Sequence, residues 1–181
     1  MEKLQNALQE LICENAHILF DPNTNFIKIE EEGNSKNTQL RSVEIKGFEK
    51  IYFALKLDQE GYKFLQNDKL ILDAKNIKKA CDAIVFGEIK QKKYIFLVEL
   101  KSETADHVAE KFKSTKAFLA YLHAILDSYY QTNLEDFTKI SILFDRNIVK
   151  GKPVLLDKKG EKYYHEGFKR TDNETRIRLF I

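Results

Sequence analysis

Two apolar runs at residues 82–89 and 94–101, followed by a long helical pattern, constrain the fold of this chain most strongly. The four residues between the runs, 90–93, are polar and typical of a hairpin loop. From 104 to 129, apolar residues recur every three or four positions, which predicts one amphipathic helix. Its stripe consists of Val108, Phe112, Thr115, Leu119, Leu122, Leu126 and Tyr129.

Shorter patterns complete the expected order of elements. Residues 2–15 predict an amphipathic helix, and 60–67 a short helix or irregular segment. Strands are predicted at 26–31, in two pieces within 42–57, and at 69–72, 139–146 and 176–181. This order favours an α/β fold with a mixed central β-sheet flanked by helices. The 181 residues suit a single domain, with a core at about 2–146 and a C-terminal strand or hairpin extension at 147–181.

Composition excludes several classes of protein. Hydrophobic residues make up 43% of the chain, too many for a disordered protein. No apolar run approaches the roughly 18 to 20 residues of a membrane-spanning helix. The N-terminal segment carries acidic residues early, unlike a secretory signal. Cys13 and Cys81 cannot form a disulfide framework and lack metal-ligand spacing, so we expect a cytoplasmic protein without a membrane partner.

Charge is uneven along the chain. Residues 1–74 hold 9 basic and 13 acidic residues, whereas 75–181 hold 21 basic and 15 acidic residues. The second half is therefore a candidate surface for a polyanion, although ordinary surface lysines explain the same count. Because 25 of the 30 basic residues are lysine, contact with a phosphate backbone is favoured over base reading.

Charged residues gather at one end of the predicted hairpin. Glu99 and Lys101 interrupt the apolar run 94–101 and, two residues apart, share one face of the strand. If Ile89 pairs with Tyr94 across the loop, Asp82 lies opposite Lys101 on that face. A shift of the register by one residue would send Asp82 to the other face.

Two carboxylates and one ammonium group at a sheet end fit a metal-dependent hydrolase. Carboxylate oxygens suit Mg²⁺, which keeps several waters and binds substrate phosphate oxygens. The metal lowers the pKa of a bound water, and a neighbouring lysine can orient that water or stabilise developing charge.

This arrangement resembles the PD-(D/E)XK nuclease superfamily, which has the restriction-endonuclease-like fold. The resemblance covers residues 80–130: Asp82, then Glu99-Leu100-Lys101 after an apolar strand, then a long helix. It implies a restriction-endonuclease-like core with Asp82, Glu99 and Lys101 as catalytic residues. Asp82, Glu99 and the Leu100 backbone carbonyl would be metal ligands, and Lys101 would act on the attacking water.

The family also suggests a further ligand and shows one departure. Many members place an acid on the first helix near the metal, and Glu14 or Glu10 could match it, with Glu14 preferred. Cys81 stands before the aspartate, where the motif's name has proline.

The expected function is a Mg²⁺-dependent endonuclease that hydrolyses phosphodiester bonds, with Mn²⁺ as a substitute. DNA is favoured over RNA, and a role in restriction or antiphage defence follows by resemblance only. Sequence recognition would come from loops, a homodimer or a partner subunit. The alternatives are a catalytically inactive module that binds nucleic acid or a protein, an RNA- or tRNA-directed nuclease toxin, and a Glu99–Lys101 pair that merely sits in water at a strand end.

Two groups of basic residues are candidate phosphate contacts. Lys111, Lys113 and Lys116 flank the apolar stripe of the predicted helix, and Lys169 and Arg170 lie in an aromatic-rich C-terminal stretch. For both groups, an ordinary solvated surface is the favoured interpretation.

Overall fold

A computed structural model describes most of the chain. It covers residues 1–30, 42–57, 80–101 and 107–144, together with the backbone of 145, 155–156, 162–167 and 174–176. The elements predicted at 60–67 and 69–72, and the end of the strand predicted at 176–181, lie outside these residues. In the described part, no helix is both long enough and apolar enough to cross a bilayer.

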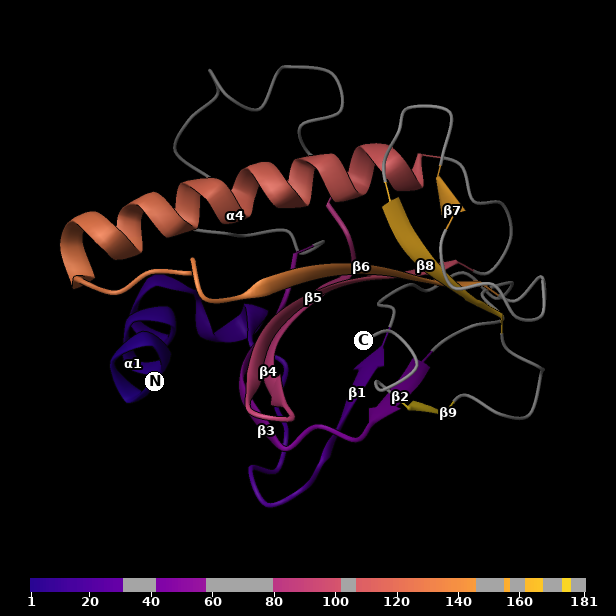
Figure 1. Cartoon of the computed structure of the whole chain (residues 1–181), viewed down its shortest axis with the longest axis horizontal. Helices are drawn as coiled ribbons and strands as arrows, with labels where there is room; N and C mark the ends of the chain where they lie inside the picture. Colours follow the sequence, from indigo (N-terminus) through magenta and orange to yellow (C-terminus); the bar gives the residue numbers. More distant parts are fainter. Residues whose placement is uncertain are drawn as a thin grey trace.

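The main sheet contains antiparallel and parallel strands, which confirms the predicted mixed α/β class (Figure 1). Its order over the described residues is β3-β4-β5-β6-β8-β7. The strands are β3 (Lys50–Lys56), β4 (Ala83–Ile89), β5 (Lys92–Lys101), β6 (Thr138–Asp145), β7 (Leu155–Leu156) and β8 (Lys162–Gly167). Pairing is antiparallel between β3, β4 and β5, parallel between β5, β6 and β8, and antiparallel between β8 and β7.

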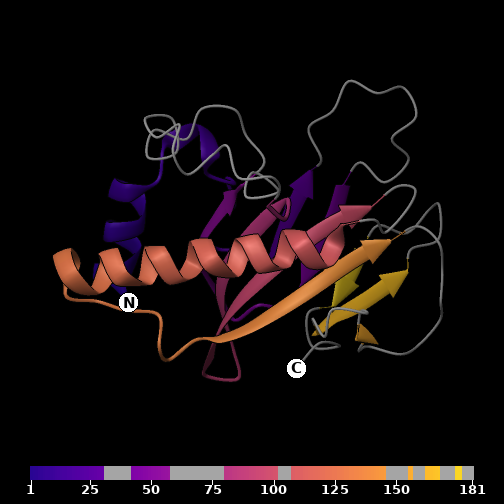
Figure 2. The same cartoon turned by 90° about the horizontal axis from the view of Figure 1, so that it is seen from above.

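The long helix α4 (Val108–Tyr130) connects two parallel neighbours, β5 and β6. Parallel strands need such a crossover because the chain must return to the same end of the sheet. Figure 2 shows α4 lying across one face of the sheet. Six of the seven residues in the predicted stripe are buried, and Tyr129 at its end is exposed. The stripe therefore decides which side of the helix meets the sheet.

The first hydrophobic core lies between this sheet face and the two helices, α4 and α1 (Glu2–Leu11). Helix α1 is shorter than the predicted 2–15 because the backbone turns extended at Ile12. The Ile12 carbonyl there bonds to the His17 ring instead of continuing the helical pattern. A separate 3₁₀ helix, η1 (Glu14–Ala16), follows.

A second core lies on the opposite face of the sheet. Here lies a smaller sheet of β1 (Phe26–Glu30), β2 (Ser42–Lys46) and β9 (Glu174–Arg176), and the apolar side chains of β1 and β2 pack into this core. Strand β5 serves both cores: Ile95 and Leu97 face the helices, whereas Phe96 and Val98 face the smaller sheet. Burial on both sides explains why its sequence lacks alternation. The proposed division into a core and an extension at 147–181 stays a prediction.

Candidate metal centre

The hairpin β4–β5 has a different register from the predicted one. Ile89 pairs with Lys92, not with Tyr94, so the connection is the two-residue turn Lys90–Gln91 rather than a four-residue loop. Both turn residues have positive φ, 52° and 59°, as in a type I′ turn. That turn matches the twist of the strands, which lets the lysines at 92 and 93 join the ladder.

The corrected register still brings the predicted residues together. It differs from the expected one by two positions, and an even shift leaves every side chain on its original face. The last ladder pair is Ala83 with Val98, so Asp82 and Glu99 are the next residues at this end of the hairpin. Asp82 therefore lies beside Glu99, and not opposite Lys101.

Asp82 is held in place through both its side chain and its backbone. Its Oδ2 accepts a hydrogen bond of 2.5 Å from the Leu100 backbone N–H. Its own carbonyl accepts a hydrogen bond from the Leu57 N–H at 3.3 Å. Leu57, which follows β3, and Leu100 of β5 thus hold the aspartate in place. The carbonyl of Leu100, implied as a metal ligand, stays a prediction.

Helix α4 adds a third anchor that the sequence reasoning missed. The Cys81 backbone N–H donates a 2.9 Å hydrogen bond to the Thr115 hydroxyl, and both residues are buried. The signal was present in the sequence, because Thr115 is the one polar residue among the first six members of the apolar stripe. Thr115 positions the segment that carries Asp82.

Glu99 is a fully buried carboxylate. Its side chain is 0% exposed, and its Oε1 lies 3.1 Å from the Lys101 ammonium and 2.8 Å from that of Lys111. Its Oε2 has no hydrogen-bond partner among the described residues. Glu99 and Lys101 do pair with each other. The surface alternative required this pair to lie in water, whereas the Glu99 carboxylate is buried.

Burial governs the ionisation of Glu99. Removal from water raises the pKa of its carboxyl to about 7, and the charge of Asp82 adds to the rise. Lys111 and Lys101 oppose it by favouring the carboxylate. In the metal-free protein, this group therefore changes charge near neutral pH.

The three α4 lysines predicted to contact phosphates lie in different environments. Lys111 lies inside the acidic pair, with its Nζ 2.8 Å from Glu99 Oε1 and 3.7 Å from Asp82 Oδ1. Lys113 is exposed and Lys116 is half-buried. The sequence contained a hint that Lys111 points toward the sheet. It lies three residues after Val108 and four before Thr115, so it shares a helix face with these two members of the buried stripe. Lys169 and Arg170 lie outside the described residues.

The acid expected on the first helix does not reach the site in the described part of the chain. Glu10 bonds to Tyr130, at the far end of α4 from Lys111, about 28 Å along a helix of 1.5 Å rise. Glu14 is exposed on η1, outside α1. Within the described ranges, no three His, Cys, Asp or Glu residues form a group that could hold a metal. Glu14 is therefore not gathered with Asp82 and Glu99.

Two donors nevertheless fit a hard cation. Asp82 and Glu99 approach the same ammonium group, and Glu99 Oε2 is a buried anionic oxygen without a hydrogen-bond partner among the described residues. Oxygen pairs of this kind suit Mg²⁺, which takes one or two protein carboxylates and completes its shell with water and phosphate. The chemistry of the donor set fits the metal, although the predicted ligand set is incomplete.

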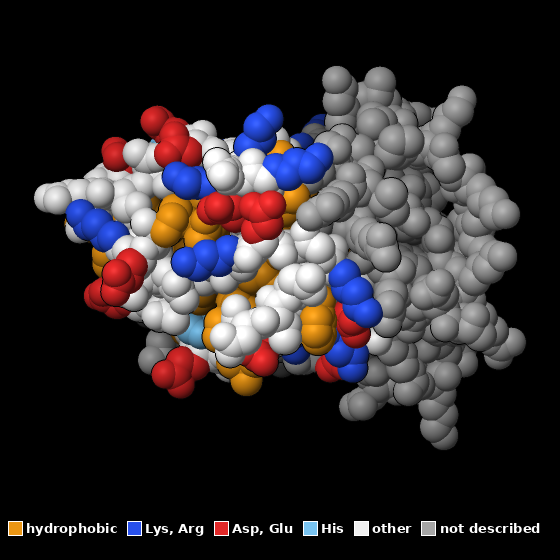
Figure 3. Space-filling model, turned by 60° about the horizontal axis from the view of Figure 1, so that its bottom comes forward, with side chains coloured by type: hydrophobic (Ala, Val, Ile, Leu, Met, Phe, Trp, Pro, Cys, Tyr) orange, Lys and Arg blue, Asp and Glu red, His pale blue; other side chains and the backbone are white. Residues whose placement is uncertain are grey.

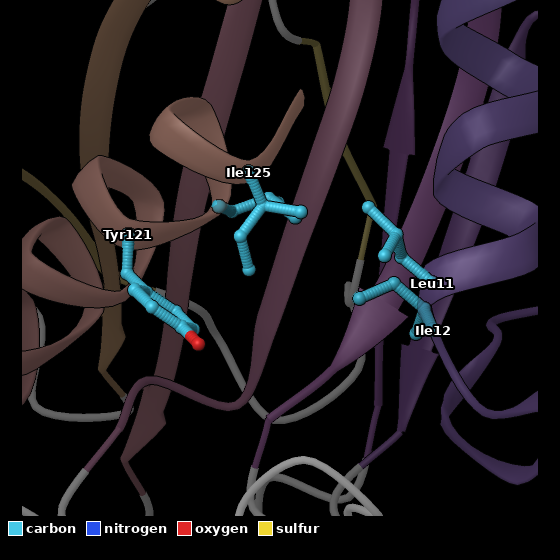
Figure 4. A pocket seen from close by; sticks show the side chains of 5 residues that line it. Leu11, Ile12, Tyr121 and Ile125 are labelled. Atoms are coloured by element: carbon cyan, nitrogen blue, oxygen red, sulfur yellow. The ribbon is translucent and has the colours of Figure 1, made fainter. Parts of the chain in front are cut away.

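An apolar pocket lies elsewhere, between α1 and α4 (Figure 4). Leu11 and Ile12 line it from one side, and Tyr121, Leu122 and Ile125 from the helix α4. It contains no carboxylate or ammonium group, and its α4 residues follow Lys111 by 10 to 14 positions. This pocket is separate from the charged site.

The surface in Figure 3 mixes charges of both signs among apolar side chains. The uneven charge along the sequence therefore does not produce a field of one sign on this face of the described residues.

Comparisons with protein-family models, curated protein sequences and solved structures found no match. The resemblance to the nuclease superfamily stays a prediction.

Proposed function

We propose that this chain is a divalent-metal-dependent endonuclease with a restriction-endonuclease-like core, acting on DNA in preference to RNA. The observation that carries the proposal is the convergence of Asp82 and Glu99 at one sheet end, with Lys101 paired to Glu99. A purely structural role is a poor explanation for these charged residues. Burying them costs free energy that apolar side chains at the same positions would not cost.

Each residue has a proposed role in phosphodiester hydrolysis. Asp82 and Glu99 hold Mg²⁺ or Mn²⁺, which when bound supplies an acidified water and offsets charge on the phosphate. Leu100 orients Asp82 through its backbone N–H. Lys101, whose side chain is 24% exposed, can reach both Glu99 and solvent, so it is placed to orient a water molecule.

The test is a cleavage assay with Mg²⁺ or Mn²⁺ on plasmid DNA, linear duplex and RNA. We expect Lys101→Met to lower the rate by at least about 100-fold, the usual contribution of a group that handles the proton of the reacting water. Glu99→Gln should lower it at least as much, because it removes a proposed metal ligand. Glu135→Gln and Lys139→Met are matched controls, since both residues are exposed and far from the site in sequence. Wild-type cleavage that survives Glu99→Gln would remove the assignment. Preference for RNA would favour the RNA- or tRNA-directed alternative.

One observation favours a second candidate, a nuclease-like module that binds nucleic acid or a protein partner without catalysis. The described residues supply two carboxylates and no third acidic ligand, and Lys101 and Lys111 already neutralise that pair. Calorimetry separates the candidates. An enzyme binds Mn²⁺ or Mg²⁺ in the absence of DNA, whereas the module shows salt-sensitive DNA binding and no uptake of either ion.

A further inference from the structure

Lys111 occupies the position where a cation between the two acids would be expected. Its ammonium lies 2.8 Å from Glu99 Oε1 and 3.7 Å from Asp82 Oδ1, and its side chain is only 15% exposed. The long helix delivers it there from the edge of a buried stripe, so the position follows from how α4 packs on the sheet. An ordinary phosphate-binding lysine would extend into solvent.

Among the described residues, the charges of this cluster balance without any metal. Asp82 and Glu99 carry two negative charges when ionised, and Lys101 and Lys111 carry two positive charges. A divalent ion added to the same oxygens would give these four residues and the ion a net charge of two positive units in a partly buried site, where repulsion between like charges is weakly screened. Of the two lysines, Lys111 is the one whose described contacts include both acids.

We propose that Lys111 is a built-in counter-ion that takes the place of the divalent cation in the metal-free protein. Metal uptake would displace its ammonium from the carboxylates, and the flexible lysine side chain would then extend toward solvent and bind a substrate phosphate. This inference rests on the proposed function, because it assumes that the two acids hold a metal.

The exchange couples metal binding to polyanion binding. In the metal-free protein, Lys111 stays paired with the two acids, so one ammonium group fewer is available to bind a phosphate than in the metal-bound protein. With metal bound, the released Lys111 and the metal itself both attract the phosphate. Thermodynamic linkage requires the converse, so a bound oligonucleotide raises the affinity for the metal by the same factor.

The first experiment measures chemical acylation of lysines in the wild-type protein by mass spectrometry. Lys113 serves as the internal reference, because it is exposed on the same helix. We expect the reactivity of Lys111 relative to Lys113 to rise severalfold when Mn²⁺ is added. A ratio that stays constant while calorimetry records Mn²⁺ binding would overturn the proposal.

The second experiment compares the Mn²⁺ affinity of wild type, Lys111→Met and Lys113→Met by calorimetry. Removing the competing ammonium should tighten binding by roughly 5- to 150-fold, the usual range of coupling between linked sites. The Lys113→Met variant should bind like wild type. Equal affinities in all three proteins would overturn the counter-ion role and leave the metal site standing. Absence of Mn²⁺ binding in all three would overturn the proposed function, and this inference with it. If Lys111→Met does not fold, the acylation result in the wild type decides alone.

Discussion

Glu99 is an acidic residue in a setting that normally excludes acids. The residues at 94–98, directly before it on β5, are apolar and buried, and Glu99 itself is fully buried. A lone buried charge would cost several kcal/mol, so the approach of two ammonium groups to one carboxylate is the expected compensation. The compensation is incomplete, because burial still raises the pKa of Glu99.

We predict that the metal-free protein loses stability as pH rises from about 4.5 to 7. The Glu99 pKa is about 7 in the folded state against an ordinary 4.5, so the folded state binds more protons over that window. The loss should approach about 3 kcal/mol, at 1.36 kcal/mol for each unit of pKa. Urea unfolding at several pH values with a chelator present measures it.

Glu99→Gln should remove this pH-dependent slope, because the amide does not titrate. The exposed Glu135→Gln is the matched control and should keep it. A slope that is unchanged in Glu99→Gln would assign the effect to another group.

Thr115→Val should destabilise the protein by about 1–3 kcal/mol, because it leaves the buried Cys81 N–H without its acceptor. Thr115→Ser keeps the hydroxyl and should cost less. The free energy of unfolding in urea measures both variants. Equal losses would mean that packing, and not the hydrogen bond, makes Thr115 important.

At the scale of elements, the turn of the β4–β5 hairpin uses residues poorly suited to it. Lys90 and Gln91 both adopt left-handed backbone conformations, where asparagine and glycine are favoured. Replacing the pair by Asn-Gly should stabilise the protein by about 1 kcal/mol, because these residues tolerate the left-handed conformation at lower cost. Thermal unfolding measures the gain, and Lys92→Gly, inside the strand, should instead be destabilising. A loss of stability on the Asn-Gly exchange would contradict the type I′ turn.

Strand β4 carries a glycine that packing requires. A Cβ at Gly87 would lie 2.7 Å from the Phe48 ring and 3.1 Å from the Lys50 backbone oxygen. Phe48 is buried and cannot easily retreat, so Gly87→Ala should cost about 1–3 kcal/mol. The cost should shrink in a Phe48→Leu background, which a double-mutant cycle in urea detects. Additive losses would show that the ring is not the obstacle.

At the scale of the whole molecule, strand β5 joins the two hydrophobic cores. Its alternate residues belong to different cores, so neither core can open without exposing part of the central strand. We therefore predict a single cooperative unfolding transition. Far-UV circular dichroism and tyrosine fluorescence should report the same midpoint in urea. Separate midpoints would show that the smaller sheet unfolds independently.

Local sequence patterns were sufficient to predict several parts of the protein. They located strands β1 to β6 and the long helix, and they placed Asp82, Glu99 and Lys101 on one face. These three residues share a face even though the predicted register was wrong. Side chains alternate with a period of two, and the register error was two residues. The end of α1 was missed, because the apolar pattern continues through Ile12, where the backbone turns extended and the carbonyl contacts the His17 ring.

The sequence by itself determined which residues alternate and which share a face, because those properties follow from backbone geometry within one element. Only the tertiary structure decided that Lys111 reaches Asp82 and Glu99, that Thr115 anchors Cys81, and that Glu10 lies at the opposite end of α4. These outcomes depend on where a crossover helix comes to rest on the sheet. That position is set by packing between distant segments, which no local pattern contains.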